Sequence, residues 1–78
     1  MKIKVLGSGC VNCMRLEENT LAAVKELGLT VELEHIYDMA EIVSYGIMAT
    51  PALVVDEKVI LAGKVADSAE IKDILNNL

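Results

Sequence analysis

The sequence predicts an α/β fold, a four-stranded mixed sheet flanked by three helices in the order β-α-β-α-β-β-α. Two observations support this order. Short runs of Val, Ile and Leu that are typical of strands come between longer segments whose apolar residues recur every three or four positions, as in helices. The final segment has the helical period, so the order ends on a helix. A chain of 78 residues is expected to form one domain, residues 1–78.

The first half of the chain predicts a strand, a helix and a second strand. Residues 2–6 alternate Ile and Val with Lys and then enter a Gly-Ser-Gly turn, which is typical of a short strand. A helix is expected from about residue 11 to residue 27, and Gly28 is placed to end it. Its apolar face is formed by Leu16, Thr20, Leu21, Val24 and Leu27. Residues 29–36 predict a second strand, parallel to the first because a helix connects them.

The second half predicts a short helix, a hairpin and a final helix. Asp38 suits the N-cap of the short helix, which is expected to end near Tyr45. Apolar runs at residues 52–55 and 59–62 flank a turn at 56–58 and predict an antiparallel hairpin. Because both runs are apolar, we expect the sheet to be covered on both faces there.

Asp67 and Glu70 have the spacing of a capping box at the start of the last helix. That helix has an apolar stripe formed by Ile71, Ile74, Leu75 and Leu78.

Composition excludes several classes of partner. Hydrophobic residues make up 54% of the chain but aromatic residues only 3%, so stacking on bases or sugar rings is not expected. The net charge is −5 and Lys and Arg do not cluster, which argues against a nucleic-acid partner. No segment resembles a signal peptide or reaches transmembrane length, so we expect a cytoplasmic protein without a membrane partner.

Both cysteines lie where the first strand leads into the first helix, in the motif Gly9-Cys10-Val11-Asn12-Cys13. In a reducing compartment this spacing favours catalysis or metal binding over a structural crosslink. Residues three apart on a helix come close enough, with small adjustments, to close and reopen a disulfide. The helix N-terminus favours a thiolate, so Cys10 is expected to have a lowered pKa and to act as the nucleophile. Cys13 should be less exposed and act as the resolving thiol.

The two cysteines leave a second chemistry open, because two close thiolates also suit Cu(I) or Zn(II). The motif alone does not decide between electron transfer and metal binding. Gly7-x-Gly9 after a strand is also the start of a dinucleotide-binding fingerprint, but Asn12 stands where the third glycine should be. The chain is also too short for a dinucleotide-binding fold, so we reject that function.

These motifs resemble the thioredoxin/glutaredoxin superfamily, and most of all its small redox-active disulfide proteins from archaea and bacteria. The resemblance spans nearly the whole chain and rests on residues 9–13, residues 45–53 and Gly63. It implies a thioredoxin-like fold of glutaredoxin size and a thiol–disulfide oxidoreductase. It further implies protein disulfide substrates, a dithiol reductant or reductase, and no cofactor or metal beyond a Cys10–Cys13 disulfide. We expect a monomer.

The resemblance also assigns roles around the two cysteines. It implies a cis peptide bond before Pro51, beside the disulfide, with the Thr50 backbone facing an extended substrate segment. Gly63 would line the same substrate groove. The remaining groove residues are expected to be Gly9, Val11 and Asn12. The chain departs from thioredoxins at Lys4, since thioredoxins carry a buried acid six positions before the first cysteine.

The remaining residues of interest are expected to have structural or surface roles. His35, the only histidine, is expected on the surface at the end of the second strand. Met14 and Met48 are expected to pack in the core or at the rim of the groove. Arg15 and Glu57 are expected to be solvated, and Tyr45 structural.

Two alternative functions remain open, a soft-metal carrier and a redox-sensing binding module. Copper chaperones of the ferredoxin-like fold also place Cys-x-x-Cys after a first strand, but those domains end on a strand. The helical C-terminus predicted here therefore favours the oxidoreductase.

Overall fold

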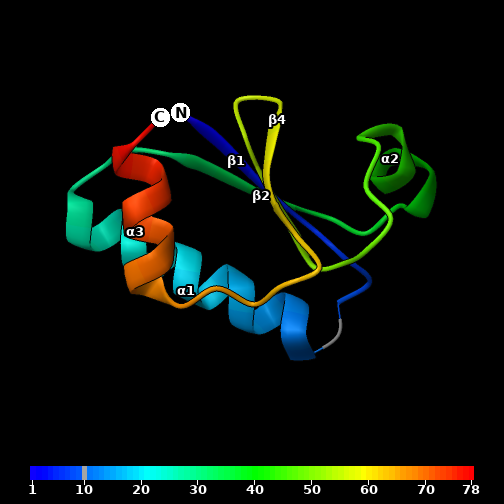
Figure 1. The fold of residues 1–78 in the computed structure, drawn as a ribbon, viewed down its shortest axis with the longest axis horizontal. Helices are drawn as coiled ribbons and strands as arrows, with labels where there is room; N and C mark the ends of the chain where they lie inside the picture. The colour runs from blue at the N-terminus through cyan, green and yellow to red at the C-terminus, as the bar shows by residue number, and fades with distance from the viewer. Residues whose placement is uncertain (10) are drawn as a thin grey trace.

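The computed structural model describes residues 1–9 and 11–78, and its elements follow the predicted order (Figure 1). The elements in chain order are β1 (Lys2–Leu6), α1 (Val11–Leu27), β2 (Glu32–Ile36), α2 (Met39–Ser44), β3 (Ala52–Val55), β4 (Lys58–Ala62) and α3 (Ser68–Asn76). The predicted fold class and element order are therefore confirmed. Among the described residues, no helix is both long enough and apolar enough to cross a membrane.

The four strands form one mixed sheet in the order β2-β1-β3-β4. β1 and β2 are parallel, as expected for strands that a helix connects, and Val5 pairs with His35. β3 is antiparallel to both β1 and β4, and the β3–β4 ladder is irregular between Leu53 and Val54. The strand that leads into the cysteine motif is therefore central in the sheet.

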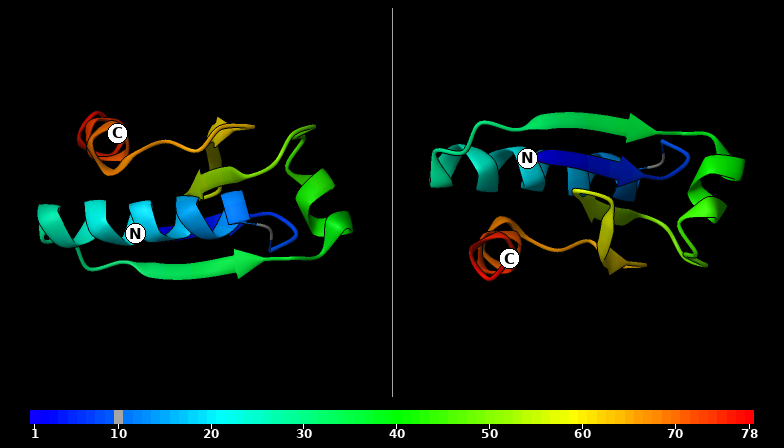
Figure 2. Two further views of the ribbon diagram at one scale, coloured as in Figure 1. Left: turned by 90° about the horizontal axis from the view of Figure 1, so that it is seen from below. Right: turned by 90° about the horizontal axis from the view of Figure 1, so that it is seen from above.

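Side chains alternate along β1, so the two faces of the sheet carry different cores. Ile3 and Val5 belong to the larger apolar cluster, which includes residues of α1 and α3. Leu6 belongs to a smaller cluster with Ile36 and with Ile42 of α2. Figures 1 and 2 show α1 running along the sheet with α3 beside it on one face, and α2 on the other.

The helices begin and end at the capping residues that the sequence predicts. Gly28 follows α1 with a φ of +68°, a conformation that costs glycine little. Asp38 Oδ1 accepts a hydrogen bond of 3.0 Å from the Ala40 N–H, and Asp67 Oδ1 accepts one of 2.8 Å from the Glu70 N–H. Both predicted N-caps are therefore confirmed.

Three predictions need correction. β2 is shorter than residues 29–36, because it begins at Glu32. The hairpin turn holds two residues rather than three, since β4 begins at Lys58 and both Asp56 and Glu57 have positive φ, as in a tight two-residue turn. The sheet is covered on both faces at β3, which is buried throughout, but not at β4, the edge strand, where no residue is fully buried.

Candidate active site around Cys13 and Pro51

Cys13 lies in the first turn of α1, and its side chain is fully buried. Burial of Cys13 is consistent with a resolving thiol, but the expected difference in exposure from Cys10 stays a prediction. Cys10 lies outside the described residues, and so does the predicted Cys10–Cys13 disulfide.

Gly7, directly after β1, provides the space for the Cys13 sulfur. A Cβ placed on Gly7 would lie 2.1 Å from Cys13 Sγ and 4.0 Å from Pro51 Cα. The Gly7 N–H donates a 3.0 Å hydrogen bond to the Ile36 carbonyl, which continues the β1–β2 pairing and holds the glycine in place. The sulfur of Cys13 therefore lies against the backbone of Gly7, close to Pro51.

Gly7 is a site residue that the sequence did not indicate. The sequence predicts only that Gly7 lies in the turn after the first strand, and the dinucleotide fingerprint that Gly7-x-Gly9 begins is incomplete. The feature that identifies Gly7 is its position. It directly follows the central strand β1 and precedes helix α1, which carries Cys13 on its buried face.

Pro51 brings the second loop of the site beside Cys13. The Thr50–Pro51 peptide bond is cis, as the resemblance implied, and Pro51 is buried. The Gly63 N–H donates a 2.8 Å hydrogen bond to the Pro51 carbonyl. A Cβ on Gly63 would lie 2.9 Å from Ala49 Cβ, so this position needs a glycine. The structure thus brings Gly63 to the Pro51 loop.

The remaining groove residues of the prediction lie at the surface. Val11 is 67% exposed, and Asn12 and Thr50 are also exposed. Met48, which was expected to be packed, is fully exposed, and that prediction is wrong. An apolar pocket of about 350 Å³ adjoins Thr50 and is lined by Met39, Ile42, Val43, Ile47, Met48 and Ala49.

Gly9, the residue before Cys10, packs against Tyr37. Its φ is +87°, and a Cβ there would lie 2.9 Å from Tyr37 Cε1. The Tyr37 ring in turn stacks on the His35 ring, with centroids 4.2 Å apart and an interplanar angle of 4°. A side chain at Gly9 would therefore require the Tyr37 ring to shift.

The His35 side chain is largely covered, and its predicted surface position is wrong. Its side chain is only 8% exposed, and its Nδ1 lies 2.9 Å from Glu17 Oε1. Tyr37 lies against the imidazole ring, and Glu17 reaches it from α1. Strand alternation explains the burial, because His35 lies on the same face of β2 as Leu33, toward α1.

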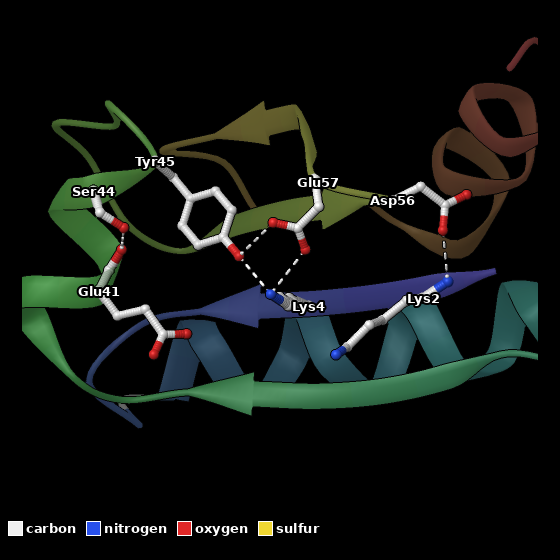
Figure 3. A network of polar contacts seen from close by, with 7 residues as sticks. All are labelled: Lys2, Lys4, Glu41, Ser44, Tyr45, Asp56 and Glu57. Atoms are coloured by element: carbon white, nitrogen blue, oxygen red, sulfur yellow. Dashed lines mark hydrogen bonds and ion pairs between the residues drawn. The ribbon is translucent and has the colours of Figure 1, made fainter.

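Lys4 stands where the resemblance to thioredoxins implies a buried acid. Its ammonium group is paired on the face of the sheet opposite α1 (Figure 3). Its side chain is 12% exposed, and Nζ lies 2.9 Å from Glu57 Oε1. Nζ also donates a hydrogen bond to the Tyr45 hydroxyl, which itself donates to Glu57 Oε2 at 3.3 Å. The hydrogen bonds to Tyr45 and Glu57 raise the pKa of Lys4 well above its ordinary value. The hydrogen bond from Lys4 lowers the pKa of Glu57.

This Lys4–Tyr45–Glu57 network joins three segments that are distant in the chain. Lys4 is on β1 ahead of the cysteine motif, Tyr45 is the C-cap of α2 ahead of the Pro51 loop, and Glu57 is in the hairpin turn. The structural role expected for Tyr45 is confirmed. Glu57 is 66% exposed, yet it is paired.

Stability at acid pH is expected to depend on Glu57. A carboxyl group whose pKa is lower in the folded than in the unfolded protein adds stability above the unfolded pKa, and this is lost as the pH falls through the folded pKa. We expect the melting-temperature difference between the native protein and Glu57→Gln to shrink as the pH falls from about 6 to about 3. Circular dichroism melts across this range measure the difference.

The control for this experiment is Glu34→Gln, which removes an exposed carboxylate from β2. Its difference from the native protein should change less over the same pH range. A Glu57→Gln difference that stays constant would contradict the pairing. Lys4 does not affect this window, because its raised pKa keeps it charged and its contribution is lost only in alkali.

The family model of the thioredoxin domain matches residues 1–76 of this chain. The chain belongs to the thioredoxin family. A thioredoxin from Methanothermobacter thermautotrophicus is 47% identical over 76 residues, which cover 97% of this chain and 99% of that protein. A thioredoxin from Methanocaldococcus jannaschii is 33% identical over 75 residues, or 96% of this chain and 86% of that one.

Membership of the thioredoxin family makes this protein a thiol–disulfide oxidoreductase. It exchanges electrons with protein disulfides and with a reductant. The soft-metal carrier considered from the cysteine spacing is not favoured, since the matches cover nearly the whole chain and all are to thioredoxins.

Proposed function

We propose that this thioredoxin-family protein works through a reversible Cys10–Cys13 disulfide, with Cys10 as nucleophile and Cys13 as resolving thiol. The observation that carries the proposal is the buried sulfur of Cys13, held against Gly7 and close to Pro51. A sulfur that solvent does not reach is poorly placed to attack an incoming substrate. It is well placed to attack a disulfide that forms on its neighbour in the same motif.

The proposed exchange has two steps. The Cys10 thiolate attacks a substrate disulfide, a bond forms between Cys10 and one substrate sulfur, and the other substrate sulfur leaves as a thiolate. Cys13 then loses its proton and attacks the Cys10 sulfur, which closes the Cys10–Cys13 disulfide and expels the second substrate thiolate. The two leaving thiolates take up the proton of Cys13 and one from solvent. The substrate has gained two electrons, and a dithiol reductant returns the protein to its reduced form.

The surroundings of Cys13 support extended protein segments as substrates. Thr50, Val11 and Asn12 are exposed next to the buried pair formed by Cys13 and Pro51. Gly63, hydrogen-bonded to Pro51, keeps side-chain bulk away from the same edge. Within the proposal, the chain acts as a single-domain monomer in the cytoplasm, without a cofactor or metal.

A redox titration tests the proposal directly. Protein equilibrated in buffers of graded dithiol-to-disulfide ratio is alkylated and weighed by mass spectrometry. We expect both cysteines to become protected together in one two-electron transition. Protein purified under reducing conditions is analysed for metal in parallel. Stoichiometric copper or zinc without a measurable disulfide couple would overturn the proposal in favour of the metal carrier.

A further inference from the structure

Tyr37 is an exposed aromatic side chain that has no part in the exchange steps above. It directly follows β2, and it is 56% exposed. The only other aromatic side chain among Phe, Trp and Tyr in the sequence is Tyr45, which is bonded to Lys4. An exposed tyrosine ring offers a large apolar area, and such rings are enriched where proteins bind partners. Tyr37 is therefore a candidate for contact with the substrate.

The Tyr37 ring is held in one orientation. One face of the ring stacks on the His35 ring, with centroids 4.2 Å apart and an interplanar angle of 4°. The imidazole is fixed in turn by Glu17 of α1, whose Oε1 lies 2.9 Å from His35 Nδ1. A ring that is already fixed loses little conformational freedom when a partner binds to it.

The edge of the same ring lies against the cysteine motif. A Cβ on Gly9 would lie 2.9 Å from Tyr37 Cε1 and 3.5 Å from Tyr37 Cδ1. The missing side chain at Gly9 thus leaves room for the tyrosine beside the residue that precedes Cys10 in the sequence. Val11, in the same motif, is 67% exposed. A protein segment that reaches the motif therefore meets apolar surface there.

Strand register places Tyr37 and Pro51 on opposite sides of the end of β1. Leu6 is the last residue of β1, and it pairs with Ile36 on one side and with Ala52 on the other. Tyr37 is the next residue after the first of these partners, and Pro51 is the residue before the second. Neighbouring strands are about 4.8 Å apart, so the backbones of Tyr37 and Pro51 are roughly 10 Å apart. The chain that leads into the cysteine motif thus leaves the sheet between a tyrosine and a proline.

We propose that Tyr37 is a specificity-determining residue for thiol–disulfide exchange, and that its exposed face binds an apolar side chain next to the disulfide of a protein substrate. This inference rests on the proposed function and names a preference among its substrates. His35 covers one face of the ring, so a substrate meets the other face. Contact with an apolar side chain removes apolar area of both groups from water, which a small polar side chain does much less.

Two symmetric peptide disulfides test this preference. Each consists of two identical short peptides joined through their single cysteine, which Leu flanks on both sides in one probe and Ser in the other. Because the probes are symmetric, it does not matter which sulfur is attacked. The assay regenerates the reduced protein with a dithiol at fixed concentration, and chromatography measures the released peptide thiol. The quantity compared is the ratio of kcat/KM for the Leu probe to kcat/KM for the Ser probe.

We expect the native ratio to exceed the ratio of the uncatalysed exchange rates with the dithiol by roughly tenfold. Tyr37→Ala should lower it to about the uncatalysed ratio. Tyr37→Phe keeps the ring and should keep the native ratio. Since each ratio compares two substrates of one variant, a partial loss of folded protein lowers both rates equally and leaves the ratio unchanged.

Leu21→Ala is the matched control, because it removes another apolar side chain of α1 that is 46% exposed. It should keep the native ratio. A native ratio no higher than the uncatalysed one overturns the inference, and so does a Tyr37→Ala ratio equal to the native one. The proposed function fails by a different result, namely a redox titration of the native protein that shows no Cys10–Cys13 couple.

Discussion

Replacement of Cys13 by serine is expected to slow turnover strongly and to leave a mixed disulfide on the protein. In the proposed exchange, Cys13 attacks the Cys10 sulfur from within the same motif, and an oriented internal group acts at a very high effective concentration. An external thiol has to replace it in Cys13→Ser, so turnover with a protein disulfide should fall on the order of a thousandfold. Gel electrophoresis without reductant, followed by mass spectrometry, measures the trapped complex.

The matched control is Cys10→Ser, which keeps the buried sulfur and removes the proposed nucleophile. It should lose turnover without trapping a complex. The chain has only two cysteines, so an adduct on Cys13→Ser has to involve Cys10. A complex trapped by Cys10→Ser instead would mean that Cys13 makes the first attack, and the two roles would have to be exchanged.

Most of the fold could be predicted from the sequence because its signals are local. The alternation in β1, the helical period of α1 and the caps at Asp38 and Asp67 each depend on residues within a few positions of one another. The cysteine motif is also local in sequence, since Cys10 and Cys13 are three residues apart. What the sequence predicts well is thus the order of elements.

The polar contacts that the sequence did not predict join residues distant in the chain. The Lys4 network reaches Tyr45 and Glu57, and the His35 ring is held by Glu17. A single histidine among glutamates on a short strand carries no sequence signal that distinguishes a buried position from an exposed one. Only the strand register and the position of α1 over β2 show that it faces inward.

Dependence on tertiary contacts also explains why the predicted packing of Met48 is wrong. A methionine beside an apolar segment is most often packed, but here the loop between α2 and β3 turns it fully outward. Which side chains of an irregular loop face solvent depends on tertiary contacts rather than on periodicity. The loop prediction was therefore right about the Pro51 bond and wrong about this neighbour.

Gly7→Ala is expected to damage both stability and exchange, although it adds a single methyl group. That group would lie 2.1 Å from Cys13 Sγ, far inside van der Waals contact. The backbone of Gly7 lies outside the left-handed region, so alanine is not strained there and the contact alone acts. If the surrounding core residues shift to make room for the methyl group, we expect a loss of roughly 2–3 kcal/mol in unfolding free energy, as for other overpacked sites.

Thiol–disulfide exchange should fail whether the core shifts or the Cys13 side chain rotates. If the Cys13 side chain rotates away instead, stability suffers less but the sulfur no longer lies where it can resolve the mixed disulfide. We therefore expect turnover to fall by roughly tenfold or more, since small misplacements of reacting groups are costly. Urea unfolding and turnover with a protein disulfide measure the two effects.

Gly28→Ala is the matched control for Gly7→Ala. Gly28 has a φ of +68° and open space around its Cβ position, so alanine there costs about 1 kcal/mol of backbone strain. It lies beyond the far end of α1 from Cys13, and turnover should stay native. Equal turnover in the two variants would show that the Cys13 sulfur does not need the space at Gly7. A selective loss in Gly7→Ala would make that space, rather than the cysteine spacing alone, the feature that holds the resolving thiol in place.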